Sequence, residues 1–205
     1  MDIELNVINH SNDANNQDIV IFQRNIASDS DEEAVAWKVI QNLGHGWNHP
    51  FKYIEMLEVA ASDAYGNYTP RLSTQNGQTF GMHPSNSGDV LELEGPSANP
   101  NEIEINNGLE TGEISAGIYR SGSLLAAASA LAPTQKAVFG FKPVICIGVV
   151  SQIEEGQVMN SAIISQVNTE ISLLGIASAD IVLTGGGPGP TSKPFQFDVQ
   201  NVVEA

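Results

Sequence analysis

The segment GEISAGIYRSGSLLAAASALAPTQKAVFGFKPVICIGVVSQIEEG, residues 112–156, decides the fold class of this chain. Apolar residues alternate with small or polar ones, the turn-like sequence RSGS separates the first two runs, and Pro143 separates the last two. The pattern predicts strands over 114–119, 124–131, 137–141 and 144–150. The last run is too short to span a membrane. We therefore predict a buried antiparallel sheet at the centre of a sandwich.

The composition bounds the size of the molecule and its partners. The chain has 205 residues, of which 41% are hydrophobic, and this suffices for one substantial core. We expect a single domain over 1–205. The chain has 24 acidic and eight basic residues, which give a formal charge of −16. Because a field of this sign repels nucleic acid and anionic membrane surfaces, we expect no nucleic-acid partner and no membrane insertion. The acidity fits solubility, a cationic partner or a divalent cation.

The only cysteine and the first residues bear on the compartment. Cys146 lies in the apolar run VICI (144–147), where a thiol acts as a small apolar filler, so we predict a core residue and not a nucleophile. The chain begins MDIELNVINHS, with acidic residues where a secretory signal has a basic start and a continuous apolar segment. We expect a cytoplasmic protein by default, and release by a non-classical route stays open.

The remainder of the chain also has a β pattern. Further strands are predicted over 3–8, 18–22, 51–60, 89–94, 101–106, 179–184 and 195–203. Residues 34–43 fit both a helix, with Ser30 and Glu33 as a capping box, and a strand, which we favour. Segment 158–167 fits a strand or a short helix. The sequence predicts an all-β, antiparallel sandwich of jelly-roll type with room for one short helix.

Two local patterns make narrower predictions. Asn76-Gly77 predicts a hairpin that joins 71–72 to 79–80, because this dipeptide favours tight turns between paired strands. Glu92, Glu94, Glu102 and Glu104 alternate with apolar residues, so we expect all four on solvent-facing sides of their strands.

Three histidines are the candidate metal ligands. His45 and His49 share the loop HGWNH, and His83 lies in GMHP (81–84), so their imidazoles could converge on a metal with a carboxylate such as Asp63. In a jelly roll such a set would favour a metal-dependent oxygenase or isomerase. The loop lacks the helix that makes two histidines at this spacing face one ion. A metal-dependent oxygenase is our third hypothesis, and we expect no cofactor.

Aromatic and acidic residues in turns are candidates for ligand binding. Trp47 and Tyr65 could stack on a sugar ring while Asp63 accepts hydrogen bonds from its hydroxyls. The acidic loop SDSDEE (28–33) offers oxygen ligands to calcium, although it lacks the glycine and the distal glutamate of a helix-loop-helix calcium site. A glycan- or calcium-binding sandwich, with a small ligand or divalent cation as partner, is our second hypothesis.

Glycines and small residues favour contact with another copy of the chain. Gly185, Gly186, Gly187 and Pro188 begin a loop that lacks the Gly-Lys-Ser/Thr of a phosphate-binding loop, and its glycines permit close-packed backbone at a subunit contact. The small-residue run LLAAASAL (124–131) could pack closely against a neighbour. No catalytic constellation is recognisable. Our first hypothesis is therefore a non-catalytic, self-associating structural protein that forms a homo-oligomer, inclusion or filament.

Seven segments together resemble a known group of sequences. They are IVIFQRN (19–25), AVAWKVI (34–40), DAYGNYTPRL (63–72), AVFGFKP (137–143), IGVVSQ (147–152), VMNSAIIS (158–165) and IVLTGGGPG (181–189). This combination is similar to a family of small uncharacterised microbial proteins, some of which carry an automatic label of aromatic ring-opening dioxygenase. The resemblance spans nearly the whole chain but implies no mechanism, and no functional residues are carried over from it.

Overall fold

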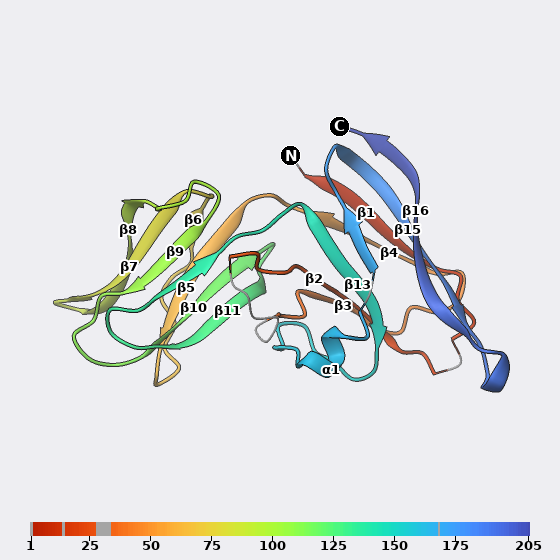
Figure 1. The fold of residues 1–205 in the computed structure, drawn as a ribbon, viewed down its shortest axis with the longest axis horizontal. Coiled ribbons are helices and arrows are strands. Elements are labelled where there is room, and N and C mark those ends of the chain that lie inside the picture. The colour runs from red at the N-terminus through yellow and green to blue at the C-terminus, as the bar shows by residue number, and fades with distance from the viewer. Residues whose placement is uncertain (1, 14, 28–33, 168) are drawn as a thin grey trace.

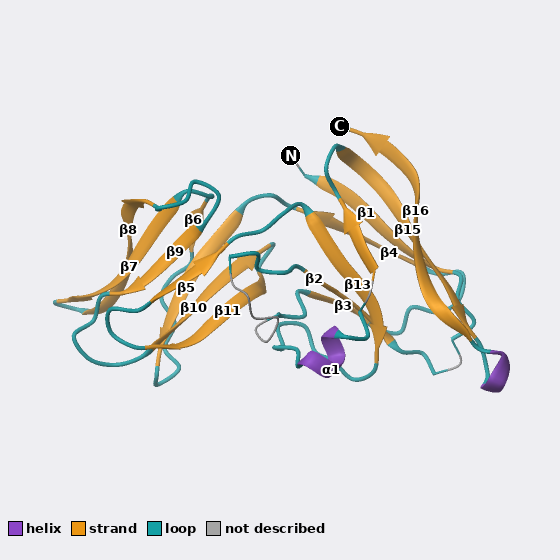
Figure 2. Ribbon diagram, in the orientation of Figure 1, coloured by secondary structure: helices purple, strands orange, loops and turns teal. Residues whose placement is uncertain are grey.

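The computed structural model describes residues 2–13, 15–27, 34–167 and 169–205. In these residues the chain is almost entirely strand, with one short helix, α1 (Ser161–Ile164), and a 3₁₀ turn at Gly189–Thr191 (Figure 2). The predicted all-β sandwich is confirmed. The jelly-roll connectivity is not confirmed, because the strands form four separate four-stranded sheets. No helix in the described ranges is long and apolar enough to cross a membrane.

Two sheets are built from both ends of the chain. Sheet I has the strand order β16 (Lys193–Glu204), β15 (Ile176–Gly186), β1 (Ile3–Asn9) and β4 (Asn48–Tyr53). Sheet II has the order β14 (Thr169–Ser172), β13 (Val144–Val150), β2 (Asp18–Phe22) and β3 (Lys38–Ile40). The first and last strands do not pair with each other. Both pair with β15, β1 in parallel and β16 antiparallel, so both chain ends lie on this sheet.

The other two sheets come from the middle of the chain. Sheet III has the order β11 (Ser123–Leu131), β10 (Ile114–Arg120), β5 (Leu57–Asp63) and β6 (Leu72–Thr74). Sheet IV has the order β12 (Lys136–Phe139), β9 (Ile103–Asn107), β7 (Gln78–Ser85) and β8 (Gly88–Pro96). The molecule is elongated, with sheets III and IV at one end and sheets I and II at the other (Figure 1). The chain crosses between these halves twice, through residues 54–56 and 140–143.

The segment at 112–156 forms the four predicted strands but not the predicted sheet. The strands β10 and β11 are a hairpin of sheet III, β12 is the edge of sheet IV, and β13 lies inside sheet II. The prediction of one central sheet was therefore wrong. Pro133 and Pro143 lie in the two connections after β11 and β12. Because proline cannot donate to a ladder, these connections leave one sheet for the next.

One hydrophobic core runs through the molecule. Alternate residues of β1, such as Leu5 and Val7, point into it, and the same cluster includes residues from all four sheets. A second, smaller cluster lies on the other face of sheet II, where Phe22 and Cys146 pack in the same group as Ile164 of α1. Cys146 is buried and unbridged, as predicted. The helix therefore caps the face of sheet II that sheet I does not cover.

The structure decides two local predictions. Residues 34–43 form no helix: Ala34 and Val35 make isolated bridges, and β3 is the strand that we favoured. The hairpin at Asn76-Gly77 was wrong, because β6 pairs with β5 in sheet III whereas β7 pairs in sheet IV. Gly77 still has φ of 87°, but its turn carries the chain from one sheet to the other.

The expectation for one glutamate was also wrong. Glu104 is only 6% exposed, and its carboxylate lies 3.0 Å from the Lys136 ammonium. The neighbouring strand β12 pairs alongside β9 and screens this side chain from solvent, while the lysine partner compensates its charge.

Candidate functional site

The strand β16 is a long free edge of sheet I. It pairs with β15 on one side only, and most of its residues are exposed. Val199, Val202 and Val203 are 37%, 48% and 55% exposed. An edge of this kind presents unpaired backbone N–H and C=O groups, beside apolar side chains, to any strand that approaches it.

The regular part of this edge has clear limits. Register shifts occur near Gly186 at one end and around Asn201 at the other, where Asn201 has φ of 50°. Between them, residues 196–200 pair continuously with 180–184. Pro194 precedes this part and Asn201 follows it, so the free hydrogen-bonding edge is uninterrupted over 196–200.

The glycine loop predicted for self-association lies at the start of β16. Gly185 has φ of 93°, and a Cβ placed there would lie 2.1 Å from the Pro194 carbonyl oxygen. A Cβ on Gly186 would lie 2.9 Å from the Phe195 ring and 3.0 Å from the backbone nitrogen of Asp13. The close approach of the chain's own strands therefore explains these two glycines. Gly187 and Pro188 line a hollow of about 710 Å³ in the same turn.

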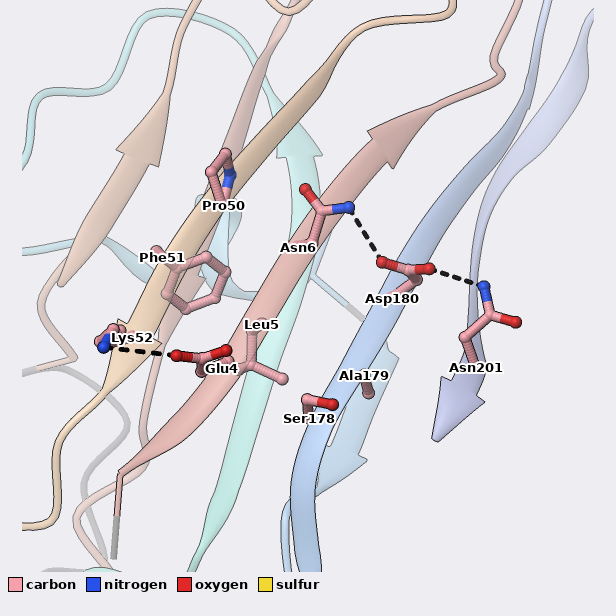
Figure 3. Close-up of a pocket in the computed structure, with 10 residues that line it drawn as sticks. All are labelled: Glu4, Leu5, Asn6, Pro50, Phe51, Lys52, Ser178, Ala179, Asp180 and Asn201. Carbon is pink, nitrogen blue, oxygen red and sulfur yellow. Dashed lines mark hydrogen bonds and ion pairs between the residues drawn. The ribbon is translucent and has the colours of Figure 1, made fainter. Parts of the chain in front are cut away.

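A groove of about 550 Å³ lies on the outer face of sheet I (Figure 3). A polar row crosses its four strands: Asn48 Nδ2 donates to Asn6 Oδ1 at 2.9 Å, and Asn6 Nδ2 donates to Asp180 Oδ1 at 2.9 Å. Asn201 Nδ2 completes the row by donating to Asp180 Oδ2 at 2.7 Å. The hydrogen bonds from Asn201 and Asn6 hold the pKa of Asp180 below its ordinary value. The carboxylate is therefore ionised at neutral pH.

His83 lies apart from the other two predicted metal ligands, His45 and His49. His45 Nδ1 is 2.7 Å from the Ser11 carbonyl oxygen, and His49 is in β4 of sheet I, where burial and then the charge of Lys38 lower its pKa. His83 is in β7 of sheet IV, at the other end of the molecule, and its Nε2 lies 2.7 Å from Glu94 Oε1. Among the described residues no three histidine, cysteine, aspartate or glutamate side chains form a group that could hold a metal ion.

Of the residues predicted for ligand binding, Trp47 lies apart from Asp63 and Tyr65. Trp47 is 66% exposed beside Gly44 at the start of β4, whereas Tyr65, 91% exposed, follows β5 in sheet III. Asp63 accepts hydrogen bonds from the backbone nitrogens of Tyr65 and Asn67 and from Asn67 Nδ2. The bonds from Asn67 lower the pKa of Asp63. Its oxygens thus hold its own turn together. The acidic loop 28–33 lies outside the described residues.

Sequence reasoning missed Arg120, which it assigned to a turn. Arg120 is the last residue of β10 and is only 3% exposed, with its guanidinium 4.1 Å from the Tyr53 ring centroid. A signal was present, because the alternation of Ile114, Ala116 and Ile118 continues to this position and places it on the buried face.

The row Asn6, Asp180 and Asn201 was also missed. Its members come from three strands, and nothing local in the sequence joins them.

Comparison with models of protein families, with curated proteins and with solved structures finds no match.

Proposed function

We propose that this protein is a self-associating structural protein whose copies meet through the free edge of β16. The observation that carries the proposal is the length and exposure of this edge strand, together with the three exposed valines along it. Natural sheets usually block their edges with charges, prolines or short strands when association is unwanted. Over 196–200 this edge carries one charged residue and no proline.

The charges on β16 favour a second copy of the same strand in antiparallel orientation. Lys193 lies at one end of the strand and Glu204 at the other, so antiparallel pairing brings Lys193 toward Glu204 of the partner subunit. Between them only Asp198 is charged. In a chain with a net charge of −16, β16 thus carries one positive and two negative side chains.

Pairing of this kind has a simple symmetry. Two antiparallel β16 strands are related by a two-fold axis, so the contact is self-complementary and closes as a dimer. Sheet I then continues from one copy into the next as a single sheet. The dimer is the unit from which a larger inclusion or filament would be built through other surfaces.

Sedimentation velocity between about 1 µM and 1 mM protein tests the proposal, since this range brackets the affinities of weak and moderate dimers. Wild type is expected to change from monomer to dimer. The double variant Val199→Glu, Val202→Glu should stay monomeric to at least about tenfold higher concentration, because it replaces apolar side chains with four like charges along the two paired strands.

A matched control is available in the other half of the molecule. Leu93 is 54% exposed on β8, the free edge of sheet IV, and Leu93→Glu should leave the dimer unchanged. A wild type that stays monomeric throughout the range contradicts self-association. Dissociation by Leu93→Glu but not by the β16 variant would move the interface to sheet IV and refute the β16 assignment.

A second candidate function is glycan binding in the groove on sheet I. The observation that favours it is the row of Asn6, Asp180 and Asn201, whose amides and carboxylate line a groove large enough for one or two sugar rings. A thermal-shift screen with mono- and disaccharides at about 10 mM checks it. Stabilisation of wild type but not of Asp180→Ala is expected, and no shift with any sugar would contradict it.

A further inference from the structure

The hollow between the two halves of the molecule is a third concave site, of about 750 Å³. Both crossing segments contribute to its lining: Glu55 and Met56 from the first, and Phe141 and Lys142 from the second. Arg120 of β10 also lines it. Small-molecule sites are commonly found where two packed units meet, and this volume lies within their usual range.

Arg120 is a buried cation with incomplete partners. Its guanidinium donates to Gln23 Oε1 and stacks 4.1 Å from the Tyr53 ring centroid, with the Trp37 ring centroid at 5.9 Å. Its Nε is buried without a hydrogen-bond partner. Burial lowers the pKa of Arg120, whereas Tyr53 and the charge of Glu55 act in the opposite direction. A guanidinium remains charged in proteins, so an anion that reaches it gains a charge-assisted hydrogen bond.

The remaining lining determines the chemistry of such an anion. Lys142 is exposed at the same hollow and adds a second positive charge, and these are two of the chain's eight basic residues. Met56, which is largely exposed, and Phe141, which is half-buried, supply an apolar wall. Glu55 is the one acidic side chain of the lining. Two cations beside an apolar wall match a ligand with one anionic group and an apolar body.

We propose that this hollow binds a small amphipathic carboxylate, with its anionic group at Arg120 and Lys142 and its apolar part against Met56 and Phe141. The site is independent of the β16 edge. In a strongly acidic protein, a site that concentrates positive charge is selective for anions, because the rest of the surface repels them.

The fluorescent probe 8-anilinonaphthalene-1-sulfonate, whose sulfonate stands in for the carboxylate, tests the site. Saturable binding to native wild type is expected. Lys142→Met should weaken it about fivefold, as for an exposed ion pair, and Arg120→Met about fiftyfold, as for a buried charge-assisted hydrogen bond. Glu55→Gln should strengthen it, because the opposing charge is removed. Lys38→Met, at a lysine outside the hollow, is the control and should leave it unchanged.

Competition identifies the ligand class. Octanoate should displace the probe, whereas octanol, which lacks the charge, and inorganic sulfate, which lacks the apolar body, should not. Equal displacement by octanol, or displacement by sulfate alone, would overturn the amphipathic assignment. Near-UV circular dichroism verifies that each variant is folded. If Arg120→Met is not folded, the other two variants test the site. Weaker probe binding by Lys142→Met and stronger binding by Glu55→Gln support the site, and unchanged binding by both variants rejects it.

Discussion

Replacing Arg120 by methionine should change the stability of the fold much less than replacing it by alanine. Methionine fills most of the same space, so the packing against Tyr53 and Trp37 is largely kept. The loss of the cation–π contact costs about 2 kcal/mol. The loss of a partner for Gln23 Oε1 costs about 1–3 kcal/mol. Relief of the buried charge, whose desolvation lowers the pKa of Arg120, returns several kcal/mol.

The net effect of Arg120→Met is therefore expected to lie within about 2 kcal/mol of wild type. Arg120→Ala removes the same charge but keeps none of the packing and leaves a cavity, so it should cost about 3–5 kcal/mol more than Arg120→Met. Urea unfolding measures the free energy of unfolding of both variants. The fluorescence of Trp37, which is buried beside Arg120, reports the transition.

Arg71 provides a matched control, because it stacks 4.0 Å from the Tyr119 ring centroid at an exposed site. Arg71→Met should cost less than about 1 kcal/mol. If Arg120→Met destabilises the protein as much as Arg120→Ala does, the charge itself holds the two halves together. The reasoning that the guanidinium is dispensable for stability, and thus available to a ligand, would then be refuted.

Two further predictions concern carboxylates. Lys136→Ala should cost about 1–2 kcal/mol in thermal or urea unfolding, because it leaves the nearly buried Glu104 without its partner, and Glu104→Gln in that background should recover part of the loss. Asp180 has a pKa lowered in the folded state, so its contribution is present above the unfolded pKa of about 3.9 and is lost as the pH falls through the folded value. The stability advantage of wild type over Asp180→Asn should therefore shrink in unfolding curves below about pH 4, and an advantage that stays constant there would contradict the assignment.

Strand positions were predictable because they depend on local alternation. Buried residues such as Ile3, Leu5 and Val7 recur at every second position, and this period marks one face of a strand wherever the strand lies. The partition into four sheets was not predictable. Alternation shows which face of a strand is buried, but not which strand pairs beside it. The strand β1 pairs with β15, which is so distant in the sequence that the facing residues Asn6 and Asp180 are 174 residues apart. The turn at Gly77 has the same local chemistry whether the chain returns to the same sheet or leaves it.

The candidate sites were less predictable than the fold, for a related reason. The edge strand was predicted over 195–203, but its exposure depends on its position at the end of sheet I. The burial of Arg120 could have been predicted, because every second residue from Ile114 onward faces the core. Its contact with Tyr53 could not, because that contact depends on how the two halves pack. His45 and His83 were grouped by residue type alone, and the fold places them in different halves.

The two crossings between the halves also determine the order in which the molecule can fold. Sheets III and IV contain only residues 57–139, so every strand that they need has been synthesised before the last third of the chain emerges. Sheet I cannot close until β15 is available, although β1 precedes the other described strands in the sequence. Long-range pairing of this kind is slow. Sheets III and IV can therefore assemble first, and the half that contains the N-terminus completes its structure last, which reverses the usual order in which domains fold during synthesis.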